Sequence, residues 1–143
     1  MRHGGPSRRG RADYRIFAST ARAMDDDAYG HLNNVVHYAL FDATVNGWLI
    51  EAGLIGPARA RIGLVAETGC RYHSEMAYPD RIAAGLRVAH LGTSSVRYEL
   101  GLFRNEAELA SAEGFFVHVY VDRATRRPAP LPPDLRAALE TLR

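Results

Sequence analysis

The sequence predicts an α+β domain in which an antiparallel sheet wraps around one long, buried helix. Three observations lead to this fold class. The chain has 143 residues, which suits one domain with a single core. Apolar residues recur at spacings of three and four over residues 34–52, a pattern typical of a helix. Apolar and other residues alternate in several later segments, which indicates half-buried antiparallel strands.

The first twelve residues are expected to be a flexible basic leader, and residues 13–143 a single domain. The leader contains Arg2, Arg8, Arg9 and Arg11 but no acidic residue. Without these four arginines the formal net charge of +2 changes sign, so the basic character belongs mostly to the leader. We therefore expect the leader to be solvated, and we expect no nucleic-acid partner.

Composition excludes several classes of function. No apolar run approaches the roughly 20 residues that cross a bilayer, and no segment resembles a signal peptide, so we expect a cytoplasmic protein without a membrane partner. Cys70 is the only cysteine, which rules out an internal disulfide. The chain has no lysine, which rules out Schiff-base chemistry on lysine. No metal-ligand motif occurs, so neither a metal nor another cofactor is expected.

A polar loop precedes the predicted helix. Residues 25–34 are rich in Asp, Asn and Gly. Asn33 or Asn34 can cap the helix, and Gly53 can end it in a left-handed conformation. Because two apolar stripes run along the helix, we expect it to be enclosed rather than to lie on a surface. The first stripe comprises Tyr38, Phe41, Val45, Trp48 and Ala52, and the second Val36, Leu40, Ala43, Gly47 and Ile50.

The remaining elements follow from alternation and turn signals. Residues 14–23 are compatible with a first strand, and a short C-terminal helix is expected over 134–142. Turns with Pro, Gly, Asn or Asp separate the strands, which favours antiparallel neighbours. The strands are expected within 63–74 and over 82–89, 96–103 and 115–122.

The segment from Asp25 to Tyr38 resembles the signature of the 4-hydroxybenzoyl-CoA thioesterase-like branch of the hotdog thioesterases. The matching pattern is Asp25-x-Asp27-x-x-Gly30-His31-x-Asn33-Asn34-x-x-x-Tyr38. Residues 92–99, 112–122 and 127–132 are similar to the family's fourth strand, last strand and exit segment. The resemblance runs from about residue 14 to 133. It implies the hotdog fold, a homodimer or homotetramer, and hydrolysis of an acyl-CoA thioester.

The resemblance also implies that Asp27 is the catalytic carboxylate, acting as general base or as nucleophile. Thioester hydrolysis needs such a group and a donor for the carbonyl oxygen as it gains charge. The free backbone N–H groups at a helix start suit the second task, and Asn34 matches that position. The alternative for Asp27 is a loop aspartate that caps the helix and shares its role with Asp25 and Asp26.

Other residues of the motif are expected to contact the substrate or to shape the loop. His31 can orient Asp27, bond the substrate, protonate the leaving group, or merely bond to the backbone, and these alternatives stay open. Gly30 suits a tight turn. Asn33 is expected to cap and shape the turn, and Tyr38 to pack. The expected substrate-binding residues of this segment are Tyr29, Gly30, Asn33 and Tyr38.

The sequence departs from the family where CoA phosphates are expected to bind. Some members carry basic residues before the fourth strand, whereas this chain has Gly92-Thr93-Ser94-Ser95. Ser94, Ser95, Arg97 or Arg71, the last from a neighbouring subunit, can substitute for these basic residues; the alternative is that the nucleotide lies in solvent. Weak nucleotide contacts would also permit an acyl-carrier protein as the holder of the substrate.

Two other functions remain compatible with the sequence. A hotdog hydratase or dehydratase uses a His/Asp or His/Glu pair, which His31 and Asp27 could form. A non-enzymatic acyl-CoA-binding protein would use the same pocket without turnover. Release of free thiol, addition of water to an enoyl-CoA, and binding without either reaction distinguish the three.

Overall fold

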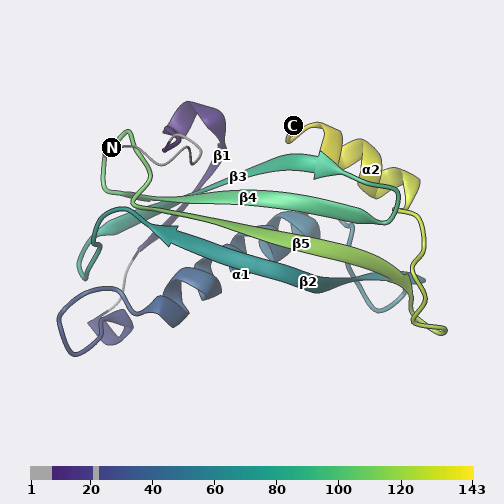
Figure 1. The fold of residues 1–143 in the computed structure, drawn as a ribbon, viewed down its shortest axis with the longest axis horizontal. Helices are drawn as coiled ribbons and strands as arrows, with labels where there is room; N and C mark the ends of the chain where they lie inside the picture. Colours follow the sequence, from purple (N-terminus) through teal and green to yellow (C-terminus); the bar gives the residue numbers. More distant parts are fainter. Residues whose placement is uncertain (1–7, 21–22) are drawn as a thin grey trace, which may run out of the picture.

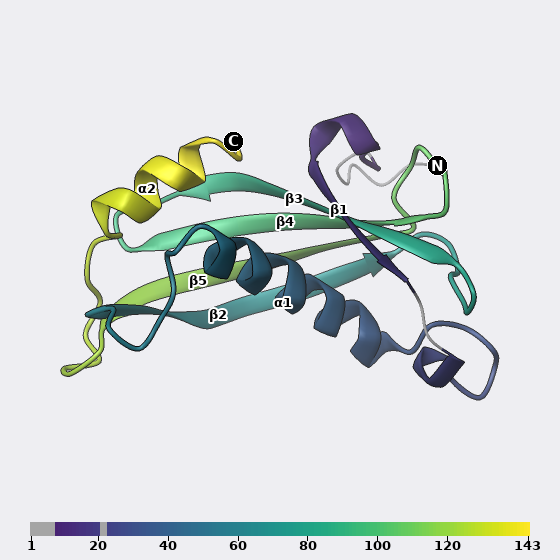
Figure 2. The same cartoon turned by 180° about the vertical axis from the view of Figure 1, so that it is seen from behind.

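The computed structural model describes residues 8–20 and 23–143, which form one antiparallel sheet, a long helix on one face of the sheet, and a short C-terminal helix (Figures 1 and 2). The strand order is β1-β3-β4-β5-β2. The predicted α+β architecture is therefore confirmed. The strands are β1 (Arg15–Thr20), β2 (Arg61–Tyr72), β3 (Arg81–Leu91), β4 (Ser95–Arg104) and β5 (Ala112–Asp122), and the helices are α1 (Asn34–Glu51), α2 (Pro133–Glu140) and the 3₁₀ turns η1 (Arg11–Asp13) and η2 (Ala23–Asp25).

Helix α1 begins and ends where the sequence predicts. Asn33 is the N-cap, and its side-chain oxygen accepts a hydrogen bond from the Val35 N–H at 3.0 Å. Gly53 follows the helix with φ of +70°, a conformation that glycine adopts without strain. One stripe of the helix is buried against the sheet, and it consists of His37, Phe41, Val45, Trp48 and Leu49.

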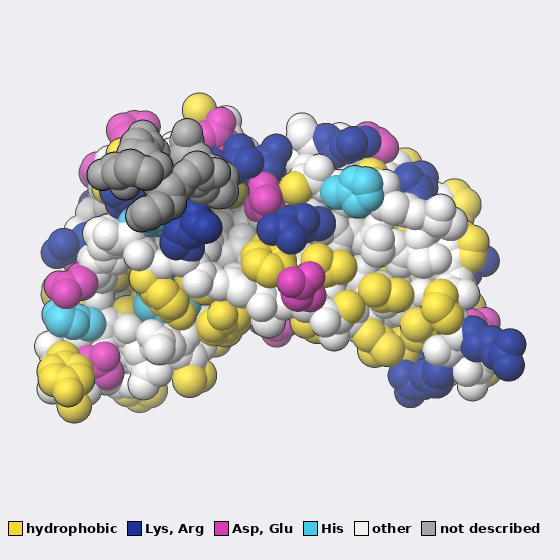
Figure 3. Space-filling model, in the orientation of Figure 1, with side chains coloured by type: hydrophobic (Ala, Val, Ile, Leu, Met, Phe, Trp, Pro, Cys, Tyr) yellow, Lys and Arg dark blue, Asp and Glu magenta, His cyan; other side chains and the backbone are white. Residues whose placement is uncertain are grey.

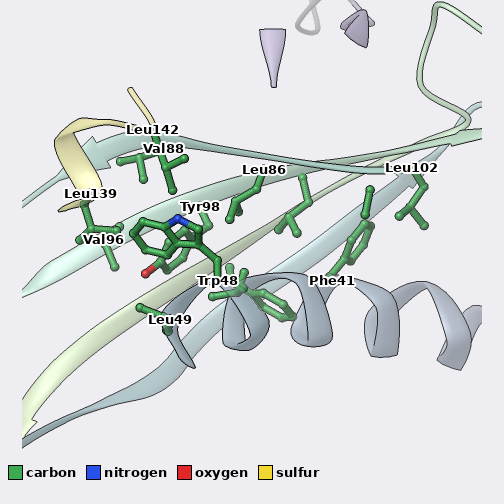
Figure 4. Packing of buried hydrophobic residues seen from close by; sticks show 14 of the residues in the cluster. Phe41, Trp48, Leu49, Leu86, Val88, Val96, Tyr98, Leu102, Leu139 and Leu142 are labelled. Atoms are coloured by element: carbon green, nitrogen blue, oxygen red, sulfur yellow. The ribbon is translucent and has the colours of Figure 1, made fainter. Parts of the chain in front are cut away.

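The core lies between this stripe and the inner face of the sheet (Figure 4). Strands β3 and β4 supply alternate residues to it, as the period of two predicts, among them Leu86, Tyr98 and Leu102. Phe41 reaches across to β5, where Gly114 has no side chain to obstruct it. A Cβ atom at Gly114 would lie 2.4 Å from the Phe41 ring, so this glycine lets α1 approach the sheet closely.

The opposite side of α1 is open in the single chain, which differs from the expected enclosure. Val35 is 72% exposed and Ile50 is 65% exposed. The reason is that five strands curve over only one side of the helix (Figure 2). Helix α2 does not cover this side, because its Leu135 and Leu139 pack into the core and the following Leu142 bonds through its carbonyl to the Val88 N–H of β3.

Strand β2 is a long, uncovered edge of the sheet. It pairs with β5 along one side, and its central residues, 63–68, are all exposed. Leu64 and Val65 are among the exposed large hydrophobic residues of the chain. Figure 3 shows hydrophobic side chains gathered along this lower edge of the molecule. A twelve-residue edge with apolar side chains is a surface on which another strand can pair.

Residues 8–14 lie on the outer face of the sheet, opposite α1. The Ala110 N–H donates to the carbonyl of Arg9, and the Arg11 N–H donates to the carbonyl of Glu108, both at 3.1 Å. Tyr14 covers the backbone of Gly85 in β3 and of Gly101 in β4. Residues 8–12 of the predicted leader are thus packed onto the sheet, while its residues 1–7 lie outside the described part of the chain.

The described residues lack two kinds of feature: a membrane-spanning helix and a cluster of metal-ligand side chains. Within the described residues, no helix is long and apolar enough to cross a membrane. The same part of the chain has no group of three or more His, Cys, Asp or Glu side chains arranged to hold a metal ion.

Candidate functional site

The loop before α1 is a tight turn closed by backbone hydrogen bonds. The Asp27 N–H donates to the His31 carbonyl at 2.7 Å, and the Gly30 N–H donates to the Asp27 carbonyl at 3.1 Å. Gly30 has φ of +75°, which explains the glycine at this position. The turn is tied to the body of the domain by the Leu32 N–H, which donates to the Met76 carbonyl at 2.7 Å.

The Asp27 carboxylate is fixed by this turn and is exposed in the single chain. Its Oδ1 accepts hydrogen bonds from the N–H groups of Tyr29, at 2.8 Å, and His31, at 3.2 Å. The N–H groups of His31 and Tyr29 lower the pKa of Asp27 below its usual range, because they stabilise the charged form. Asp27 is therefore an ionised, oriented carboxylate that can still reach a water molecule or a substrate carbonyl.

The two neighbouring aspartates have other roles. The Asp26 carboxylate accepts a hydrogen bond from the Tyr78 N–H at 3.0 Å, which ties the loop to the segment before β3. Asp25 is buried, and its backbone carbonyl accepts from the Asn33 N–H at 2.9 Å. Of the three adjacent carboxylates, Asp27 is the one whose residue is exposed at the turn.

The start of α1 supplies backbone donors beside this loop. Asn33 uses its side-chain oxygen on Val35, and the Val36 N–H donates to the Asn33 carbonyl at 2.9 Å. Asn34 is the first helical residue, so its N–H is one of the donors that a helix leaves without an intrahelical acceptor. The positive end of the helix dipole lies at the same place and favours negative charge.

His31 contributes to the loop through its backbone more than through its ring. Its N–H and carbonyl both bond to Asp27, whereas its ring Nε2 lies 3.2 Å from Glu75 Oε2. Both side chains of this pair are largely exposed. Sequence reasoning missed Glu75, because it comes from the connection between β2 and β3 and no motif links it to His31.

The two tyrosines of the motif differ in their surroundings. Tyr29 is 84% exposed at the tip of the loop. Tyr38 lies one turn into α1, is half-buried, and packs edge-on against Phe41 with ring centroids 6.0 Å apart. Tyr38 therefore has the packing contact that the sequence predicts for it.

Arg71 and Arg97 lie on the outer face of the sheet, with the sheet between them and α1. Together with Arg9, Tyr14 and Glu113 they line a hollow of about 360 Å³. Arg97 stacks over Phe115 at 4.0 Å from the ring centroid and lies 3.5 Å from Glu99. Arg71 lies at the end of β2 where Tyr72 contacts His37 of α1, but its side chain is on the face of the sheet opposite the helix, as is that of Arg97.

Ser94 lies in the turn between β3 and β4 and Ser95 is the first residue of β4, at the opposite end of the molecule from the Asp27 loop (Figure 1). The Ser94 carbonyl accepts from the Tyr120 N–H and the Ser95 carbonyl from the Gly92 N–H, at 2.7 and 2.8 Å. The structure therefore places both serines away from the loop, and it places the side chains of Arg71 and Arg97 on the face of the sheet opposite α1. The predicted residues that it brings together are Asp27, Tyr29, Gly30, His31, Asn33, Asn34 and Tyr38.

A second hollow lies on the helix side of the sheet. It has a volume of about 260 Å³ and is lined by the C-terminal half of α1, the loop after it, and strands β2 and β5. His118 and Tyr120 of β5 form its floor, and Leu49 and Leu54 form part of its wall. Neither this hollow nor the one on the outer face is lined by Asp27, His31 or Asn34.

Solved structures show the same fold. PA5185 from Pseudomonas aeruginosa strain PAO1 is 47% identical, with a TM-score of 0.90 over 96% of this chain and 97% of that chain. A thioesterase-superfamily protein from Jannaschia sp. CCS1 is 23% identical, with a TM-score of 0.79 over 88% and 80% of the two chains. Slr0204 from Synechocystis, a 1,4-dihydroxy-2-naphthoyl-CoA thioesterase, is 15% identical, with a TM-score of 0.81 over 89% and 96%.

The family comparison covers most of the domain. No curated protein matches this chain. The family model for the thioesterase-like superfamily matches residues 21–139, a range that includes the Asp27 loop, α1 and strands β2 to β5. The hotdog fold class predicted from the sequence is confirmed by this match and by the solved structures. The chain therefore belongs to the thioesterase-like superfamily.

Proposed function

We propose that this protein hydrolyses acyl-CoA thioesters, with Asp27 as the catalytic carboxylate and the Asn34 N–H as a donor to the thioester oxygen. The observation that carries the proposal is the Asp27 carboxylate itself: two backbone N–H groups fix it, ionised and exposed, beside the start of α1. Membership of the thioesterase-like superfamily supports hydrolysis as the reaction class.

Two routes from this carboxylate to products are chemically balanced. As a general base, Asp27 takes a proton from water while the water oxygen attacks the carbonyl carbon, and the proton then passes to the sulfur as the C–S bond breaks and CoA leaves as the thiol. As a nucleophile, Asp27 attacks the carbonyl carbon directly, CoA leaves, and water hydrolyses the resulting anhydride. In either route the carbonyl oxygen gains charge, which the Asn34 N–H and the helix dipole stabilise.

The ring of His31 bears on the hydratase alternative. The His31 ring does not pair with Asp27, whose contacts to His31 are through the backbone, so the histidine–acid pair that a hydratase needs would be His31 with Glu75, and addition of water to an enoyl-CoA tests that alternative. Binding of acyl-CoA without turnover remains the competing outcome, and so does an acyl-carrier protein in place of CoA as the substrate's holder.

A second copy of the chain is part of the proposal, since the Asp27 loop is open in the single chain. Pairing of β2 with β2 of a second copy around a two-fold axis would satisfy the free edge and cover Leu64 and Val65. Such an axis reverses the direction of α1 in the second copy. In one chain, the loop before α1 and the C-terminal end of α1 lie at opposite ends of the sheet (Figure 2), so in the two-fold pair the Asp27 loop of each copy would lie at the end where the partner's α1 ends.

The test of the reaction is release of free thiol from a panel of acyl-CoA and acyl-carrier-protein thioesters. We expect turnover by the wild type and its loss in Asp27→Asn, which keeps the size of the side chain. Asp26→Asn is the matched control, because Asp26 bonds to Tyr78 instead, and it should retain turnover. Wild-type turnover by a folded Asp27→Asn protein would remove Asp27 from its role.

A single turnover in H₂¹⁸O, with enzyme in excess, tests for the nucleophilic route. The general-base route puts ¹⁸O into the product acid, and so does the nucleophilic route if water attacks the acyl carbon of the anhydride. Only attack of water at the Asp27 carboxyl carbon of the anhydride puts ¹⁸O into Asp27 and leaves the product acid unlabelled, so label in Asp27 identifies the nucleophilic route. Mass spectrometry measures the ¹⁸O content of the product acid and of the peptide that contains Asp27.

The test of the dimer uses charge on the two edges of the sheet. Leu64→Lys/Val65→Lys on β2 should shift the molecular mass in light scattering to that of one chain and abolish turnover, because Lys on an edge blocks strand pairing. Ile16→Lys is the control, since Ile16 is 39% exposed on β1, the opposite edge. A β2 variant with unchanged mass would exclude this interface.

A further inference from the structure

His118 is a buried histidine that has no hydrogen-bond partner on either ring nitrogen within the described residues. Its side chain is buried on the inner face of β5, at 6% exposure. The Tyr98 hydroxyl of β4 is also unpartnered, and the two rings lie edge to face with centroids 5.2 Å apart. Figure 4 shows Tyr98 in the layer between the strands and the C-terminal half of α1. A buried polar group without a partner costs about 1–3 kcal/mol, so this one calls for an explanation.

The surroundings of His118 point to a ligand as its partner. His118 lines the hollow of about 260 Å³ between α1 and strands β2 and β5, while protein atoms cover both of its ring nitrogens, so a molecule in the hollow reaches a nitrogen only if a neighbouring side chain shifts. The walls include Leu49, Leu54 and Ile62, which suit the carbon atoms of an acyl group. The polar atoms at the floor would then fix one oxygen of that group.

The arginines at the rim of this hollow are engaged by the protein itself. Arg59 forms two bonds to Asp134, at 2.7 and 2.9 Å. Arg61 donates to the Pro130 carbonyl at 2.8 Å, and Arg123 donates to two backbone carbonyls. These arginines are therefore engaged elsewhere, whereas His118 lines the hollow with both ring nitrogens unpartnered within the described residues.

The charge state of His118 defines the chemistry of this partner. Burial lowers the pKa of the imidazole, and the nearby charge of Asp42 opposes this effect in part. The neutral ring presents one donor and one acceptor. A hydroxyl can accept from the ring N–H or donate to the other nitrogen, and a keto oxygen can accept from the N–H, so either group satisfies one of the two nitrogens, whereas a saturated hydrocarbon chain would leave both unsatisfied.

The size and place of the hollow complete the assignment. Its volume lies below the roughly 300–1,000 Å³ of pockets for drug-sized ligands, which favours a short or single-ring acyl group. Helix α1 has 18 residues and is about 27 Å long, so the hollow beside its C-terminal half is remote from Asp27 of the same chain. In the two-fold dimer, the Asp27 loop of the second copy lies at this end.

We propose that His118 is a specificity-determining residue: it selects a short acyl group that carries a hydroxyl or keto oxygen, bound as the thioester at Asp27 of the second copy. This inference rests on the proposed thioesterase function and its dimer. His118 acts on the choice of substrate and takes no part in bond cleavage.

The experiment compares kcat/KM for matched substrates that differ by one oxygen. The substrates are benzoyl-CoA with its three monohydroxy isomers, and hexanoyl-CoA with 5-oxohexanoyl-CoA. Wild type should prefer at least one oxygenated member over its parent by about tenfold or more. His118→Phe should reduce that preference by about tenfold or more while turnover of the parent persists, and His118→Gln should keep part of it.

Two controls keep the result interpretable. His90→Phe changes an exposed histidine on β3 and should leave the preference unchanged. Thermal denaturation should show His118→Phe to be as stable as wild type or more so, because the change removes two unpartnered nitrogen atoms. An unchanged preference in folded His118→Phe, or a wild type that prefers neither oxygenated class, overturns the inference.

Binding measurements separate this inference from the proposed function. Thioether analogues, in which a methylene group separates the sulfur from the carbonyl, cannot be hydrolysed. If wild type hydrolyses no thioester, the proposed function fails, but calorimetry with the oxygenated and parent analogues still decides the role of His118. A tenfold or greater loss of affinity in His118→Phe, confined to the oxygenated analogue, supports it, and equal affinities overturn it.

Discussion

Substitution of Gly114 by Ala should destabilise the domain and impair the site at the start of α1. The added Cβ would lie 2.4, 2.7 and 2.9 Å from three ring atoms of Phe41. Carbon atoms prefer separations of about 3.5–4.0 Å, so the ring or the helix must move by about 1 Å. Phe41 is fully buried, and its ring packs edge-on against both Tyr38 and Phe116, which leaves it little freedom to rotate.

The expected cost follows from this geometry. Overpacking of a tight core costs about 1–3 kcal/mol, and each kcal/mol lowers the Tm of a domain of this size by about 2–4 °C. We therefore expect Gly114→Ala to lower the Tm by about 2–12 °C. If α1 moves away from β5, the Asn34 N–H moves with it, and a misplacement of about 1 Å can cost up to a hundredfold in turnover.

Thermal denaturation and thiol-release kinetics measure both effects. Gly47→Ala is the control, because its Cβ would meet nothing within 4 Å, and an exposed helical Gly→Ala should stabilise by about 0.5–1 kcal/mol. Phe41→Leu combined with Gly114→Ala should be less destabilised than the two single changes together, since the smaller side chain leaves room for the Cβ. A Tm equal to wild type in Gly114→Ala, or strict additivity in the pair, would refute the reasoning.

Three further predictions concern the loop, the helix start and an ion pair. The pKa of Asp27 lies below its usual range, so its carboxylate becomes protonated, and the enzyme loses activity, only as pH falls through that low value. We therefore expect kcat/KM not to decrease on the acid side between about pH 8 and 5, and a decrease centred near pH 6 would contradict this. Asn33→Ala should cost about 1 kcal/mol of stability in denaturant unfolding while Asn33→Ser costs much less, because the serine hydroxyl can still accept from the Val35 N–H. The Arg59 guanidinium lowers the pKa of Asp134 to about 2, yet both side chains are partly exposed and water screens their attraction. A double-mutant cycle with Arg59→Gln and Asp134→Asn should therefore give a coupling energy below about 1 kcal/mol. A coupling energy above about 2 kcal/mol would contradict this screening.

The elements of the fold could be predicted because each has a local signal. Periodicity located α1 and the strands, Asn33 and Gly53 marked the ends of the long helix, and the order of elements gave the α+β class. Periodicity did not reveal which face of a strand is buried. In β5 the valines at 117 and 119 look like the core set, yet Phe116, His118 and Tyr120 point inward, because the register with β4 pairs His118 with Val96.

The candidate site was predictable only where it is local in sequence. The turn from Asp27 to Asn34 folds on itself, so the motif identified its residues together. Glu75 and His118 come from distant segments, and their place beside His31 or under α1 depends on strand pairing that the sequence does not display. The same holds for Arg71 and Arg97, which strand register puts on the outer face.

The packing of Tyr14 against Gly85 of β3 and Gly101 of β4 has a practical consequence for shortened forms of this protein. Gly85 and Gly101 offer no side chain of their own there, so the phenol ring serves as the cover for that part of the sheet. A chain trimmed past residue 14 would expose two neighbouring stretches of strand and the adjoining Phe103 ring to solvent. Expression designs that trim the N-terminus should therefore keep residues 8–14.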